Sequence, residues 1–148
     1  MRARLVAILF VCACGGTAPP SRPPQPEPAP EAPAAHHKSD LIRVQAPRAG
    51  ALVHSPLRVA GEARGTWFFE ASFPVTLLDA EGRTLVQTHA QAKGEWMTEA
   101  FVPFESQLTF APPATATGTL VLAKDNPSGL PEHADELRIP VRFAPPGP

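Results

Sequence analysis

The globular part of this chain is predicted to be all-β, an antiparallel β-sandwich of about seven short strands. Apolar and polar residues alternate in short runs between residues 40 and 144, and this is the period of a half-buried strand. Proline, glycine and aspartate separate the runs, as they do in turns. No segment has a helical period of adequate length, and the 20 prolines are spread through the chain. A domain of this size can bury a core without covalent cross-links.

The third expected strand has the clearest alternation, with Phe69, Ala71, Phe73, Val75 and Leu77 on one face. A hairpin turn is expected after it at residues 79–82, where a glycine is free to take a positive φ. The expected strands are residues 41–46, 57–63, 69–77, 84–92, 97–110, 118–124 and 137–143.

Proline and glycine inside the expected strands carry positional information. Pro74 and Pro140 cannot donate a ladder hydrogen bond, so we expect them at sheet edges, bulges or unpaired positions. Pro103 indicates an interruption of the strand expected over residues 97–110. Gly61 indicates a bulge or a close approach of another backbone.

Cys14 is predicted to be the point at which the chain is attached to a membrane by lipid. Arg2 and Arg4, a short apolar run and small residues form the pattern of a secretory signal over residues 1–13. The stretch Val11-Cys12-Ala13-Cys14 resembles a bacterial lipobox, which implies cleavage before Cys14 and acylation of its thiol. The apolar run is too short to span a bilayer, which needs roughly 20 residues. An ordinary cleaved signal is the alternative, because Ala13 is an acceptable small residue before a cut. The expected location is the bacterial cell envelope, extracytoplasmic, at the outer membrane if the organism has one.

Residues 14–39 are predicted to be a disordered linker after the anchor, and residues 145–148 a disordered tail. Eight prolines fill the linker, which favours an extended polyproline II conformation. At about 3.1 Å per residue, such a linker would hold a domain up to roughly 75 Å from its anchor. His36 and His37 near its end are expected to be solvated rather than to bind a metal.

Charge and cysteine content exclude several classes of function. Loss of Arg2 and Arg4 with the signal would change the formal charge from −1 to −3, which gives no footprint for nucleic acid. Cys12 and Cys14 are the two cysteines, so neither a disulfide nor a cysteine-ligated metal is expected in the domain. The acidic segment at residues 125–136 lacks the spacing of an EF-hand and is expected to be a solvated loop. No cofactor and no metal are predicted.

The globular residues resemble the immunoglobulin-like domain of bacterial spore germination proteins and of many envelope lipoproteins. The resemblance extends over residues 41–143 and departs from the family at the loop over residues 125–136. It implies an immunoglobulin-like fold and a role in extracytoplasmic interactions, supplies no catalytic residues, and does not imply sporulation. The matching residues are Pro47, Gly50, Val53 to Leu57, Val59, Gly61 to Ala63, Phe69 to Ala71, Val75, Leu78, Asp79, Gly82, Trp96, Phe101 or Phe104, Gly118, Leu120 and Ile139 to Val141.

Trp67 and Glu70 are the candidate partner-binding residues. Glu70 either faces solvent, pairs with Arg43 or Arg58, or serves as a ligand-facing carboxylate beside exposed aromatic rings. Trp67 follows Gly-Thr, and an exposed tryptophan there would anchor a partner. Core packing is the alternative for at least one of Trp67 and Trp96.

No catalytic constellation is evident, and the chain is predicted not to be an enzyme. His54 and Ser55 are adjacent, so in a strand they point to opposite faces. We therefore expect a lipid-anchored envelope protein whose domain binds another envelope protein or cell-wall polymer. The alternatives are a purely structural spacer and the accessory domain of a small extracytoplasmic hydrolase.

Overall fold

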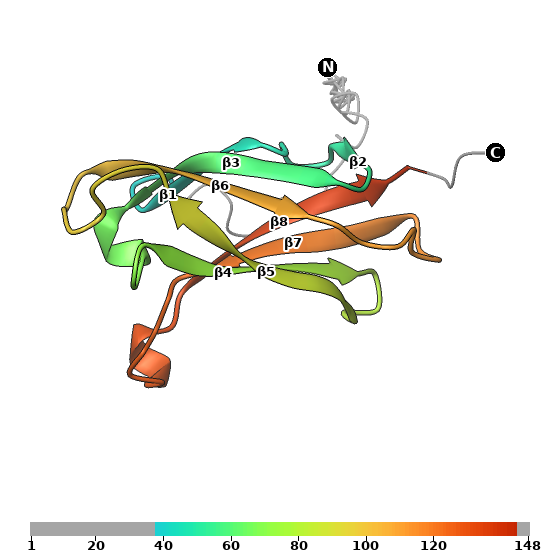
Figure 1. Cartoon of the computed structure of the whole chain (residues 1–148). Coiled ribbons are helices and arrows are strands. Elements are labelled where there is room, and N and C mark those ends of the chain that lie inside the picture. The colour runs from blue at the N-terminus through green and yellow to red at the C-terminus, as the bar shows by residue number, and fades with distance from the viewer. Residues whose placement is uncertain (1–37, 145–148) are drawn as a thin grey trace, which may run out of the picture. The chain divides into compact units, whose positions relative to one another are not determined.

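The computed structural model describes residues 38–144, and these residues form an all-β domain without an α-helix (Figure 1). The predicted fold class is confirmed. The two-residue strand β2 is the element that the alternation did not predict. The elements are β1 (Ile42–Ala46), β2 (Leu52–Val53), β3 (Leu57–Arg64), η1 (Gly65–Trp67), β4 (Ser72–Asp79), β5 (Thr84–Ala92), β6 (Phe101–Leu108), β7 (Thr117–Ala123), η2 (Pro131–His133) and β8 (Glu136–Phe143), where η marks a short 3₁₀ turn.

The eight strands form one curled sheet in the order β1-β3-β6-β5-β4-β7-β8-β2. Neighbouring strands are antiparallel except β2, which runs parallel to β8. β5 pairs with β4 and, at its end, with β6, so it joins the two layers of a sandwich. Figure 1 shows β3 and β6 in one layer and β4, β7 and β8 in the other. The sheet is curled so that its first strand, β1, comes to lie near β8, the strand next to its far edge.

The core lies between the layers and is formed within the described part of the chain. Trp67, Phe73 and Phe104 are at most 1% exposed. The ring of Phe73 contacts those of Phe68 and Phe104 edge to face, with centroids 5.2 and 5.0 Å apart. Each strand also pairs with another strand of the same sheet. Residues 38–144 therefore contain the core and the strand pairing that a self-contained domain needs.

The third expected strand begins later than predicted, because residues 69–72 form a tight turn. The N–H of Phe69 donates to the carbonyl of Ser72 at 2.9 Å, and the N–H of Ser72 donates to the carbonyl of Phe69 at 3.0 Å. Glu70 and Ala71 have φ values of 49° and 62°, the sign that a type I′ turn requires at both central residues. The prediction that Phe69 and Ala71 belong to this strand, on the same face as Phe73, is therefore wrong. Phe68 is buried before the turn, and from Phe73 onward the predicted inward face of β4 is kept, because Phe73, Val75 and Leu77 are all buried.

Pro74 and Pro140 lie at positions where no ladder hydrogen bond requires a backbone N–H, as predicted. β4 pairs with β7 from Val75 onward, so Pro74 lies just beyond the end of that ladder. Pro140 lies on the outer edge of β8, where its carbonyl accepts the N–H of Gly50 at 2.7 Å. The expected interruption at Pro103 is wrong, because β6 is continuous through it; this strand begins at Phe101 rather than at Met97.

Gly61 allows the close approach that its position in a strand predicted. It pairs with Val44, next to a bulge between Val44 and Ala46 in β1. A Cβ atom at Gly61 would overlap the carbonyl oxygen of Arg43 and lie 2.8 Å from the ring of Phe104. The absence of a side chain therefore lets β1 lie against β3.

Candidate binding groove

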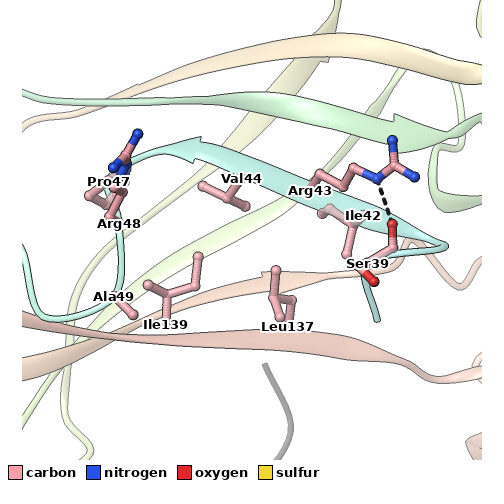
Figure 2. Close-up of a pocket in the computed structure, with 9 residues that line it drawn as sticks. All are labelled: Ser39, Ile42, Arg43, Val44, Pro47, Arg48, Ala49, Leu137 and Ile139. Atoms are coloured by element: carbon pink, nitrogen blue, oxygen red, sulfur yellow. Dashed lines mark hydrogen bonds between the residues drawn. The ribbon is translucent and has the colours of Figure 1, made fainter. Parts of the chain in front are cut away.

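An apolar groove lies between β1 and β8, where the curled sheet does not close (Figure 2). Its volume is about 280 Å³. The side chains of Ile42 and Val44 from β1 and those of Leu137 and Ile139 from β8 form its floor. Residues 47–49, which lead from β1 toward β2, close one end of the groove, and Ser39 lies at the other.

The outer edge of β1 presents backbone groups to this groove. The N–H of Arg64 donates to the carbonyl of Leu41 at 2.8 Å, so before the bulge the odd-numbered residues Leu41 and Arg43 bond to β3. By alternation, the N–H and C=O of Ile42 and Val44 point away from β3. The N–H of Ile42 donates to the carbonyl of Lys38 at 2.9 Å. The carbonyl of Ile42 and both backbone groups of Val44 therefore face the groove side.

The outer edge of β8 is covered along one half only. The carbonyl of Pro140 accepts from Gly50, and the N–H of Arg142 donates to the carbonyl of Ala51 at 2.9 Å. The even-numbered residues of β8 thus bond toward the β2 side, and the N–H and C=O of Arg138 point the same way. β2 pairs with Arg142 and Phe143 and does not extend to Arg138.

Arg43 and Arg48 line the groove, Arg138 and Arg142 lie on β8 beside it, and the four differ in their partners. The guanidinium of Arg43 donates to the carbonyl of Ser39 at 2.7 Å and to Glu62 at 3.1 Å, and it lies 4.0 Å from the centroid of Phe101. Arg138 pairs with Glu136 at 2.6 Å. Within residues 38–144, no carboxylate pairs with Arg48 or Arg142. The closed end of the groove therefore carries the uncompensated positive charge.

At the Ser39 end of the groove, the beginning of the described chain is held against β8. The ammonium group of Lys38 donates to the carbonyl of Glu136 at 2.6 Å and pairs with Asp135. The first residue of the described chain is thereby joined to the start of β8. This pair also uses one carboxylate of the acidic segment at residues 125–136.

Trp67 does not have the exposed position in which it would anchor a partner. It is 1% exposed and lies in the core cluster, which corrects the expectation of an exposed loop tryptophan. Its carbonyl accepts the N–H of Asp125 at 3.0 Å, and its Nε1–H has no hydrogen-bond partner within the described residues. Trp96 is partly buried against the same cluster. Core packing, the alternative stated for one of these tryptophans, applies to Trp67 because η1 turns it inward.

Glu70 is exposed in the tight turn, next to Phe69, which is 42% exposed. Neither expected arginine pairs with it, because Arg43 binds Glu62 and Arg58 binds Glu105. The turn does place a carboxylate beside an exposed aromatic ring. Its role in binding a partner stays a prediction.

Exposed apolar side chains gather in the loops at one end of the sandwich. β1, β4, β6 and β8 all begin at this end, since the pairing alternates between them and the strands that run the other way. Four large apolar residues in the loops before these strands are exposed: Leu41, Phe69, Met97 and Leu130. Leu52 of β2 is the fifth such residue in the described part. These loops form a second surface suited to contact.

Several predicted features lie outside the described residues or concern absences. Cys14, the signal and most of the linker are outside residues 38–144. Within this range no group of three metal-ligating side chains is found, and no helix is long and apolar enough to cross a membrane. In the segment at residues 125–136, the hydroxyl of Ser128 donates to Oδ1 of Asn126 at 2.6 Å and lies 3.0 Å from Nδ1 of His133.

Sequence reasoning assigned the floor of the groove to buried strand faces and did not find the groove. The alternation identifies which residues of β1 and β8 face inward, but it does not say which strands end up as sheet edges. Pro140 was the one signal, because a proline inside a strand marks an edge.

The fold and the groove define an immunoglobulin-like β-sandwich, a class of domain that is generally non-catalytic. Compared with known families, the chain matches the immunoglobulin-like domain of bacterial spore germination over residues 41–130, and it belongs to this family. The expected resemblance is thus confirmed over β1 to β7. The match ends inside the loop at residues 125–136, before β8. No curated protein and no solved structure matches the chain.

Proposed function

We propose that this chain is a lipid-anchored protein of the bacterial cell envelope whose immunoglobulin-like domain is a non-catalytic binding module. Its partner is another envelope protein or a cell-wall polymer. The observation that carries the proposal is the groove between β1 and β8, with its apolar floor and two strand edges. Sandwich domains bind through their edges and end loops, and the exposed apolar loops add a second contact surface.

The anchor and the linker support the envelope location. Cys14 follows a short apolar run and precedes a proline-rich segment, an order suited to holding a domain away from a lipid surface. Palmitate labelling of the full chain is expected and should be lost in Cys14→Ala. Label that persists in this variant would contradict acylation at Cys14.

Co-purification after mild crosslinking of the anchored protein tests the binding function. We expect an envelope component to be recovered with the wild-type chain and with Glu81→Gln, which changes an exposed side chain in the turn after β4, outside the groove lining and the exposed apolar loops. A purely structural spacer predicts instead that no component is enriched over a chain whose domain has been replaced by an unrelated sandwich. That result would overturn the proposed function.

A further inference from the structure

We propose that the groove between β1 and β8 binds an extended peptide segment of a partner protein by strand addition. The segment has apolar residues at alternate positions and an acidic residue near Arg48. This inference rests on the proposed function and deepens it by naming the kind of partner and the place where it binds.

The backbone groups at the groove are arranged to pair with one more strand. β2 already bonds to the outer edge of β8, so a strand on this edge is part of the fold. The next group along the edge is Arg138, whose N–H and C=O point toward the same side. Val44 presents the corresponding pair on β1. A strand placed in line with β2 would therefore continue a pairing that the chain itself begins.

The floor of the groove fits the side-chain period of a strand. Ile42 and Val44 are two residues apart on β1, and Leu137 and Ile139 are two residues apart on β8. Alternate side chains of an added strand would lie over this floor, because they point to one face. β1 spans five residues, or roughly 16 Å of strand. The bound segment is accordingly short, about five residues.

The charge at the closed end selects an acidic residue. Arg43 and Arg138 are neutralised by Glu62 and Glu136, whereas Arg48 and Arg142 have no carboxylate within the described part of the chain. The loop that carries Arg48 also holds Arg142, whose guanidinium donates to the carbonyl of Gly50 at 3.1 Å. A carboxylate of the partner would supply the missing charge-assisted hydrogen bonds.

The chain's own linker is a poor occupant of this groove. It carries glutamates, but residues 19–33 contain eight prolines, and proline has no N–H to donate to a strand edge. Residues 34–37 lack proline and are too few to span β1 after a reversal of direction. A partner segment is therefore favoured over a segment of the same chain.

The test is a selection of random seven-residue peptides displayed on phage against residues 38–148, followed by amide hydrogen exchange with the selected peptide. We expect selected peptides to alternate apolar residues and to carry Asp or Glu. Exchange at the Val44 and Arg138 amides should slow about tenfold or more at saturation, because each N–H gains an acceptor. Arg48→Ala should weaken binding about tenfold, and Arg58→Ala, an exposed arginine on β3, should leave it unchanged.

Two results would overturn the strand-addition proposal. One is a failure to enrich any peptide, or enrichment of peptides that leave the Val44 and Arg138 amides exchanging as in the free domain. The other is protection of these amides in residues 15–148 but not in residues 38–148, which would identify the linker as the occupant. In either case, recovery of an envelope component by crosslinking would still uphold the proposed binding function.

Discussion

Strand β4 begins and ends in a tight turn, and the two turns are built on different chemistry. At its end, Oδ1 of Asp79 accepts the N–H groups of Glu81 and Arg83 at 3.0 and 2.9 Å, and Gly82 takes a φ of 79°. At its start, Glu70 and Ala71 take positive φ without a glycine. For non-glycine residues this conformation is unfavourable by roughly 1–2 kcal/mol per residue.

The difference shows that one turn is determined by its own residues and the other by the packing around it. The turn after β4 is specified by its own residues, since aspartate and glycine are the types that such a turn needs. The turn before β4 is imposed by its surroundings. Trp67 and Phe68 are buried just before it, and the carbonyl of Ala71 accepts the N–H of Ala92 at 2.8 Å just after its centre. Packing on both sides therefore holds the backbone where its residues do not favour it.

The largest expected effect comes from the adjacent phenylalanines at the first turn. Phe68→Ala should lower the free energy of unfolding by about 3–5 kcal/mol, because a ring that packs against Phe73 is removed from the core. Phe69→Ala, the matched variant one residue away, should change it by less than about 1 kcal/mol. Urea denaturation measures both. Equal losses would show that Phe69 also faces the core, as in a continuous strand.

Smaller changes in the free energy of unfolding are expected from glycine substitutions at the two turns, and the two changes have opposite signs. Ala71→Gly should stabilise the domain by about 0.5–1 kcal/mol, since relief of the positive φ exceeds the added entropy of the unfolded chain. Gly82→Ala should destabilise it by about 1 kcal/mol. A Cβ atom at Gly82 meets nothing within 4 Å, so this loss is conformational and not steric. Loss of stability in Ala71→Gly would contradict the turn at residues 69–72.

The same contrast explains how far the sequence predicts this protein. The alternation in β1, β3 and β8 and the glycine of the second turn are local signals, and they predict the fold class and most strands. The first turn is not local, because the apolar alternation continues through Phe69 and Ala71, and the burial of Trp67 and Phe68 just before them accompanies a turn that the alternation does not mark. The groove is non-local for another reason: it depends on β1 and β8, at opposite ends of the described chain, becoming facing edges.

The stabilisation supplied by the second turn, unlike that of the first, should depend on pH. Burial raises the pKa of the Asp79 carboxyl, but hydrogen bonds and charge from Arg83, with the N–H of Glu81, outweigh this and lower the pKa below its ordinary value of 3.8. The folded state thus favours the carboxylate, so the stabilisation is complete above that ordinary value and is lost as the pH falls through the lower folded pKa.

Asp79→Asn should therefore be less stable than the wild type at neutral pH, with the difference shrinking in acid. Urea midpoints measured between pH 7 and pH 2 test this. Glu81→Gln is the matched control, because Glu81 is exposed in the same turn and also pairs with Arg83. A difference between Asp79→Asn and wild type that stays constant with pH would rule out the charge of Asp79 as its cause.

The smallest change in stability is expected at Glu70, where the first turn bears on function. Glu70→Gln keeps the size of an exposed side chain, so the free energy of unfolding should change by less than about 0.5 kcal/mol. If the carboxylate beside Phe69 contacts the partner, as predicted, recovery of the crosslinked component should fall in this variant. Glu81→Gln, an exposed glutamate in the turn at the other end of β4, should leave recovery unchanged. Equal recovery from both variants would mean that the strained turn serves the fold alone, and that binding does not depend on Glu70.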